Sequence, residues 1–104
     1  MKKIVGVCAC PMGVAHTYMA ADAIEEAAKK LGYKVKVETQ GAGGIEDKLS
    51  QSDIDEADLI VIASAVKLTA SERLDGHENK ILRMDLQQAI KKSYETISQR
   101  LEQL

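Results

Sequence analysis

The sequence predicts an α/β protein in which an open, mainly parallel, four-stranded sheet carries helices on both faces. Short apolar runs rich in β-branched residues alternate along the 104-residue chain with longer segments of helical periodicity. The links between these segments are short, which is typical of parallel strands joined by right-handed helical crossovers. We expect a single domain over residues 1–104, because the chain shows no internal repeat, linker or low-complexity segment.

The first half of the chain predicts two strands separated by a long helix. Residues 3–9 form a short apolar run bounded by turn residues, which indicates a buried strand. Helical periodicity follows over residues 14–31, where charged residues occupy one side and apolar residues the other. The apolar side holds Ala20, Ile24, Ala27 and Leu31. Residues 33–39 then alternate between polar and apolar, which predicts a second strand.

The middle of the chain predicts two short helical segments and a third strand. After a glycine-rich loop we expect a short helix over residues 45–49 and a further turn that Ser52 caps and that runs through residue 57. Residues 59–64 form a continuous apolar run, which is typical of a central parallel strand.

The last third predicts one more strand and a long helix. Residues 66–76 are the least regular, although 71–74 fit a helical turn, and residues 80–84 fit a fourth, shorter strand. From residue 85 to the end the pattern is helical. The apolar positions of this helix are Leu86, Ile90, Ile97, Leu101 and Leu104.

Composition and charge exclude several functional classes. The formal net charge is −2 and both signs are mixed along the chain, so the basic face of a nucleic-acid-binding protein is absent. No apolar run approaches the ~20 residues that span a bilayer, and the apolar start is interrupted by glycine and proline, unlike a signal peptide. A disulfide between Cys8 and Cys10 would be strained, so we expect a reduced, cytoplasmic setting.

The segment that joins the first strand to the first helix has the features of an anion-binding loop. Residues 10–17 read Cys-Pro-Met-Gly-Val-Ala-His-Thr. In open parallel sheets ligands bind outside the carboxyl ends of the strands. Gly13 permits unusual backbone angles, and the helix start offers free amides with partial positive charge. That setting lowers a thiol pKa, so Cys10 is the candidate nucleophile, and the same amides would hold its phosphoryl group.

Each of these residues also has a purely structural interpretation. Cys10 would then be a small buried side chain, as we expect for Cys8 inside the strand. His16 would be a helix-start residue without chemistry, and Thr17 a first-turn hydroxyl bonded to backbone amides. His77 lies among polar residues, so its default interpretation is solvated surface.

Three other chemistries compete for this loop. Thiol–disulfide exchange usually needs Cys-x-x-Cys, but the spacing here is Cys-x-Cys, and Cys8, Cys10, His16 and distant His77 are a poor metal set. A cysteine phosphatase would use Cys-x5-Arg followed by Ser or Thr; Thr17 is present, but His16 replaces the arginine. Hydrolysis is then less well supported, and a phosphocysteine would persist, as a carrier requires. We also find no nucleotide-binding loop and expect neither cofactor nor metal.

The loop resembles that of the enzyme IIB component of the fructose-type bacterial sugar phosphotransferase system. The family pattern Cys-Pro-Thr-Gly-(Ile/Val)-Ala-His-Thr-(Phe/Tyr)-Met-Ala-Ala is matched by residues 10–21, with Met12 where the family usually has Thr. The resemblance covers roughly residues 3–92. Further matches are Val-Glu-Thr-Gln-Gly at 37–41, Gly-Ile-Glu at 44–46, Asp-Ile at 53–54, Ala-Asp at 57–58, Glu-Arg-Leu at 72–74, and Gly76.

The resemblance implies that Cys10 receives phosphate from a phosphohistidine of a IIA protein. Cys10 would pass it to a fructose-like sugar bound in the IIC membrane permease, with the chain itself cytoplasmic and not inserted in the membrane. The residues implied in holding phosphate are Met12, Gly13, Val14, Ala15, His16 and Thr17. The alternatives are a low-molecular-weight cysteine phosphatase and a regulatory module that senses an anion without chemistry. Met12 leaves donor preference and sugar identity open.

Overall fold

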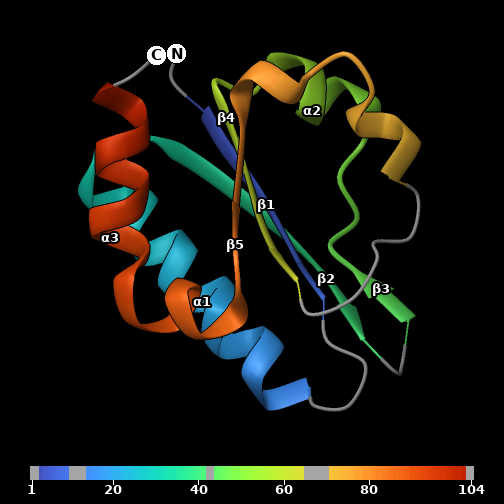
Figure 1. Cartoon of the computed structure of the whole chain (residues 1–104). Helices are drawn as coiled ribbons and strands as arrows, with labels where there is room; N and C mark the ends of the chain where they lie inside the picture. Colours follow the sequence, from blue (N-terminus) through green and yellow to red (C-terminus); the bar gives the residue numbers. More distant parts are fainter. Residues whose placement is uncertain (1–2, 10–13, 42–43, 65–70, 103–104) are drawn as a thin grey trace.

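The computed structural model describes residues 3–9, 14–41, 44–64 and 71–102, which form a five-stranded sheet with helices on both faces (Figure 1). The strand order is β3-β2-β1-β4-β5, and all neighbours are parallel except β2 and β3. The strands are β1 (Lys3–Ala9), β2 (Lys34–Gly41), β3 (Gly44–Glu46), β4 (Leu59–Ser64) and β5 (Ile81–Met84). The predicted fold class is therefore confirmed, with one strand more than expected.

The helices are divided between the two faces of the sheet (Figure 1). Helices α1 (Val14–Lys30) and α3 (Leu86–Glu102) cover one face side by side. Helix α2 (Gln51–Glu56) and the 3₁₀ turn η1 (Ser71–Leu74) lie over the other, and the 3₁₀ turn η2 (Glu78–Lys80) leads into β5. Because side chains alternate along a strand, β1 contributes to both cores. Ile4 and Cys8 pack under α1 and α3, whereas Val5 and Val7 pack under α2 and η1.

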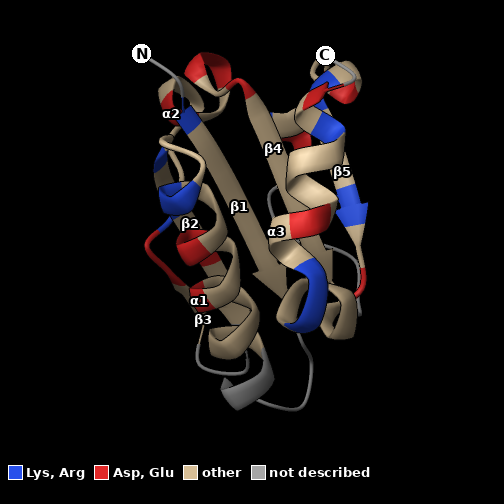
Figure 2. Cartoon of the chain, turned by 90° about the vertical axis from the view of Figure 1, so that its left-hand side faces the viewer, with Lys and Arg blue, Asp and Glu red and all other residues tan. Residues whose placement is uncertain are grey.

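Helix α1 lies on the sheet as its periodicity predicts. Ala20, Ile24 and Ala27 are buried and Leu31 is partly buried against the same core. Full burial of a side chain such as Ile24 stabilises the fold by about 1.5–3 kcal/mol. Figure 2 shows that the charged residues of α1 gather on its outer side and toward its end. The chain leaves the helix at Gly32, whose φ of 81° is a conformation that glycine adopts without strain.

Two local predictions in the middle of the chain were wrong. The expected helix over residues 45–49 is not formed; residues 44–46 instead make β3, which pairs antiparallel with the end of β2. Local periodicity does not reveal this strand, because its pairing partner is the open edge of β2. Helix α2 is capped by Ser50 rather than Ser52: Ser50 Oγ accepts from the Asp53 N–H at 3.1 Å, and the Asp53 carboxylate accepts from the Ser50 N–H at 2.9 Å.

Helix α3 departs from a straight stripe. Its backbone is non-helical at Lys92 (φ −134°, ψ 23°), and next to this kink the Ser93 hydroxyl donates to the Ala89 carbonyl. The predicted apolar positions that the structure describes all contact the core under this helix. The buried positions are Ala89, Ser93 and Ile97, whereas Leu86, Ile90 and Leu101 are only partly buried against the same core. Leu104 lies outside the described residues.

Candidate functional site

The candidate loop lies at the carboxyl edge of the sheet, between the central strand and the first helix. Strand β1 ends at Ala9, which pairs with Gln40 in β2 on one side and Ser64 in β4 on the other. The chain turns to β2 on one side of β1 and to β4 on the other, so this is the point where strand order switches direction. The predicted nucleophile Cys10 and the predicted cradle residues Met12 and Gly13 lie outside the described residues.

The start of α1 has the electrostatics of an anion site. Val14, Ala15 and His16 form its first turn, although their side chains lie outside the described part of the structure. No acidic residue stands in that turn, and the first charged residue of the helix is Asp22. Within the first turn, therefore, no acidic residue of the helix itself opposes the partial positive charge of the helix start.

Thr17 and Cys8 are both interior residues. Thr17 is only 2% exposed. Cys8 is fully buried under α1 and α3, which confirms its predicted place in the core. Burial raises the pKa of the Cys8 thiol to about 12, so near neutral pH it stays protonated and unreactive.

A hydrogen bond ties the beginning of α1 to the edge strand β3. Tyr18 Oη donates to the Glu46 carboxylate, with both oxygens at 2.8 Å. This bond to a carboxylate raises the pKa of Tyr18, because the phenolate would face a negative charge. Tyr18 is 38% exposed and its neighbour Met19 is 51% exposed, so large apolar surface is accessible one turn after the loop.

An ion pair between a fully buried carboxylate and a part-buried guanidinium lies under the α2 face of the sheet, close to the same edge. The Glu38 carboxylate accepts from Arg73 Nη1 at 2.8 Å and Nη2 at 3.0 Å, from the Leu49 N–H at 2.8 Å, and from Gln40 Nε2 at 2.6 Å. Burial would raise the pKa of Glu38, but the hydrogen bonds from Arg73, Gln40 and Leu49 outweigh it and hold the pKa below its ordinary value. Glu38 is therefore ionised at neutral pH.

The sequence analysis missed this ion pair. Alternation in β2 places Glu38 on the same side as Lys34 and Lys36, which suggests a solvated carboxylate. Its partner Arg73 is 35 residues away, in the irregular stretch 66–76. One available signal was that both residues fall within the short segments matching the phosphotransferase pattern.

Two further features lie away from the loop. His77 is not simply solvated, since its Nε2 lies 2.9 Å from Asp55 Oδ1 in α2.

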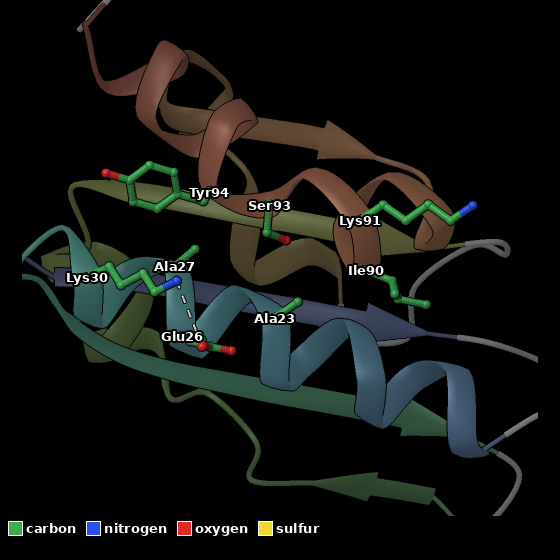
Figure 3. Close-up of a pocket in the computed structure, with 8 residues that line it drawn as sticks. All are labelled: Ala23, Glu26, Ala27, Lys30, Ile90, Lys91, Ser93 and Tyr94. Atoms are coloured by element: carbon green, nitrogen blue, oxygen red, sulfur yellow. Dashed lines mark ion pairs between the residues drawn. The ribbon is translucent and has the colours of Figure 1, made fainter.

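A hollow of about 160 Å³ lies between α1 and α3 (Figure 3), lined by Ala23, Ala27, Ile90, Ser93 and Tyr94 together with charged side chains. Within the described ranges no three His, Cys, Asp or Glu side chains gather as a metal site, and no helix there is long and apolar enough to cross a bilayer.

The described strands and helices define a class of open-sheet α/β proteins in which a central parallel strand is followed by a helix. Within that class, the family described as "PTS system, Lactose/Cellobiose specific IIB subunit" matches residues 5–100. The chain therefore belongs to the IIB subunits of the sugar phosphotransferase system (PTS).

Individual relatives point to a fructose-like branch. The chain is 50% identical over 90 residues to "PTS system fructose-like EIIB component 1" of Escherichia coli strain K12, covering 86% of this chain and 82% of that protein. Among solved structures, the enzyme IIB subunit of a PTS from Escherichia coli K12 superposes with a TM-score of 0.90 at 46% identity, over 98% of this chain and 93% of the other. A domain of a fructose-specific IIABC component from Borrelia burgdorferi gives 0.88 at 39% identity, over 97% and 94%.

Proposed function

We propose that this chain is a cytoplasmic phosphoryl carrier that uses Cys10 as its nucleophile. Cys10 takes a phosphoryl group from a phosphohistidine of a IIA protein and passes it to a fructose-like sugar held by a IIC membrane permease. Residues 1–104 act as one IIB-type domain, which reaches the membrane through IIC. Membership of the IIB family and the fructose-like relatives support the reaction class and the sugar type.

The observation that carries the proposal is the position of the loop. It follows the central strand at the switch point and precedes a helix whose first turn holds no acid. Backbone amides from Met12 through Thr17 are the proposed phosphate cradle, since amides at a helix start bind anions without a metal. The same environment stabilises the thiolate, which is the nucleophilic form of cysteine.

The transfer itself is a pair of exchanges on phosphorus. The Cys10 thiolate attacks the phosphorus of the donor; the P–N bond breaks as the S–P bond forms, and the imidazole takes the bonding electrons. In the second exchange a sugar hydroxyl oxygen attacks the phosphorus, the S–P bond breaks as the O–P bond forms, the sulfur leaves as thiolate, and the hydroxyl proton is released to solvent. Neither step needs a nucleotide or a metal on this chain, because the donor already carries an activated phosphoryl group.

The balance between carrier and hydrolase depends on arginine. A cysteine phosphatase clamps its phosphate with a loop arginine, whereas this loop has His16 at that position. The Arg73 fork is engaged with Glu38 and Leu49 inside the α2 face. A histidine offers fewer donors and is mostly neutral near pH 7, so hydrolysis of phosphocysteine receives little assistance.

The test is mass spectrometry of the protein after incubation with a phosphorylated IIA protein of a fructose-like system. We expect one added phosphoryl group, located on Cys10 by peptide mapping. Cys10→Ser should abolish acceptance, and Cys8→Ser is the matched control, because the buried Cys8 thiol has its pKa raised to about 12 and should not react. Acceptance lost only in the Cys8 variant, or phosphate found on another residue, would contradict the assignment.

A second experiment separates the carrier from a phosphatase. His16→Arg should shorten the lifetime of phospho-Cys10 or raise hydrolysis of a small aryl phosphate, because a guanidinium stabilises the hydrolytic transition state. His16→Ala should slow transfer without producing hydrolysis. If both variants melt earlier but keep the wild-type phosphocysteine lifetime, His16 is structural and this explanation of carrier behaviour is wrong.

A further inference from the structure

We propose that Glu38 and Arg73 are positioning residues for phosphoryl transfer, and that their buried ion pair holds strands β2 and β3 in register with the end of β1. The inference rests on the proposed role of Cys10. We expect loss of the pair to slow phosphoryl transfer by more than the accompanying loss of stability explains.

The ion pair joins three segments that are distant in sequence. Arg73, in η1, donates to Glu38 in β2 and, through Nη1, to the Leu49 carbonyl at 2.6 Å. Leu49 in turn donates its N–H to the same Glu38 carboxylate. The Arg73 carbonyl accepts from Gln51 Nε2 at 3.0 Å. The pair therefore fixes η1 and the chain after β3 against one point of β2.

From Glu38 the contacts lead directly to the residue before the nucleophile. Gln40 donates its side-chain amide to Glu38, and its backbone pairs with Ala9. Ala9 is followed by Cys10. Glu38 lies two residues back along β2, or about 7 Å at the usual strand rise, where it pairs with Val7. A shift of the carboxylate would therefore move the strand that flanks the end of β1.

The other end of the loop is connected to the same strands. Tyr18 of α1 donates to Glu46 of β3, and β3 pairs with β2 through Gln40 and Ile45. The chain after β3 returns to Glu38 through Leu49. Both the strand that precedes residues 10–13 and the helix that follows them are thus linked to the β2–β3 pair, which the ion pair holds in place.

Stability alone does not account for charges at this site. The buried side chains on this face of the sheet include the apolar Val5, Val7, Ile60 and Leu74. Replacing the charges of a buried ion pair by well-packed apolar side chains is often neutral or stabilising, so the attraction between the two charges is not by itself a requirement of the fold. The two parallel hydrogen bonds of a guanidinium–carboxylate pair fix the distance and the angle between the two side chains. Phosphoryl transfer depends chiefly on positioning and electrostatics, where such precision has value.

The experiment compares four proteins: wild type, the apolar double variant Glu38→Met/Arg73→Met, Arg73→Lys, and the control Asp53→Asn. Asp53 lies in α2 and bonds Lys3 and Lys36 toward the opposite edge of the sheet. For each protein we would measure the melting temperature, the rate of Cys10 phosphorylation by a phosphorylated fructose-like IIA protein, and the pH midpoint of Cys10 alkylation by iodoacetamide.

We expect the double variant to melt earlier than wild type, because the Leu49 N–H and the Gln40 amide lose their acceptor and the Leu49 carbonyl its donor. Its transfer rate should fall about ten- to a hundredfold, because small displacements of reacting groups slow a reaction by such factors. Arg73→Lys keeps a cation but not the fork, so its transfer rate should fall between the two. Asp53→Asn should melt earlier with an unchanged transfer rate. The alkylation midpoint should move in the double variant and not in the control.

Transfer rates that simply follow melting temperature across the set would overturn the inference. So would a wild-type rate in Arg73→Lys, and this variant decides the matter if the double variant does not fold. If wild type itself accepts no phosphate, the proposed function has failed separately. In that case the pH midpoints of Cys10 alkylation are the remaining test of whether the ion pair positions Cys10. Equal midpoints in wild type and the double variant would contradict the inference.

Discussion

Two carboxylates on the α2 face of this sheet have similar partners but different surroundings. Glu38, toward the carboxyl edge, is fully buried and held by Arg73, Gln40 and a backbone amide. Asp53, toward the amino edge, is partly exposed and held by Lys3, Lys36 and the Ser50 amide. Both have lowered pKa values, yet at Glu38 burial opposes the shift strongly.

The comparison shows that the desolvation cost of a carboxylate depends on its burial, whereas its stabilising contacts depend on its partners. Asp53 remains close to water and accepts hydrogen bonds from two flexible lysines. It therefore connects the start of β1 to α2 with only a small desolvation penalty. Glu38 has lost its water and depends on a complete set of donors, so each donor that is removed leaves a buried charge without compensation. A site of the second kind tolerates little movement, which suits a position beside the proposed reaction loop.

The largest expected effect is on the stability of Arg73→Met. Removing the guanidinium leaves the buried Glu38 carboxylate with only neutral donors, and such a loss typically costs about 3–5 kcal/mol. Urea unfolding at pH 7 measures it, with the Glu38→Met/Arg73→Met protein as control. If the single and double variants are equally destabilised, the cost comes from lost packing rather than from an unpaired charge.

A smaller loss is expected for Asp53→Asn. The change removes two ion pairs with lysine and weakens the Ser50–Asp53 capping box, which together should cost about 1–2 kcal/mol. The loss should shrink as salt is added, since partly exposed pairs are screened. Salt-independent destabilisation would mean that the cap, not the lysines, is the important contact.

At pH 7 the larger loss of stability is expected at the Glu38–Arg73 pair, but the larger change in the acid dependence of stability is expected at Asp53. Both groups have folded-state pKa values below their unfolded values of about 4, so each contributes stability that is present above pH 4 and lost as pH falls through the folded pKa. Hydrogen bonds from Lys3 and Ser50 hold the pKa of Asp53 well below its usual range, whereas burial limits the lowering at Glu38. Asp53→Asn should therefore remove more of the pH dependence between pH 5 and 3 than Glu38→Gln. Unfolding free energies of all three proteins across that range check the order.

The smallest effect is expected at the exposed link between α1 and β3. Glu46→Gln should bring the pKa of Tyr18 down toward the ordinary value of about 10, because the phenolate would no longer meet a carboxylate. Folding stability should hardly change at so exposed a pair. Ultraviolet titration of tyrosinate, with Tyr18→Phe used to assign the signal among the three tyrosines, measures this shift. An unchanged titration would mean that the Tyr18–Glu46 bond is not formed in solution.

The sequence by itself determined the class of the fold and the place of the candidate loop. The apolar runs of β1 and β4 agree with the structure at both ends, and the stripe of α1 identified its buried side. These features are local, because hydrophobic periodicity records which side of an element avoids water. The loop followed from them, since a strand that ends before a helix start places Cys10 at the carboxyl edge.

Only the tertiary structure decided the contacts between segments far apart in the chain. β3 forms because β2 offers an open edge, and the backbone of α3 is non-helical at Lys92. Glu38 is buried because Arg73 arrives from 35 residues away to neutralise it. No local pattern records such a pairing, because a carboxylate in an alternating strand looks solvated until the fold supplies the donors that replace its water.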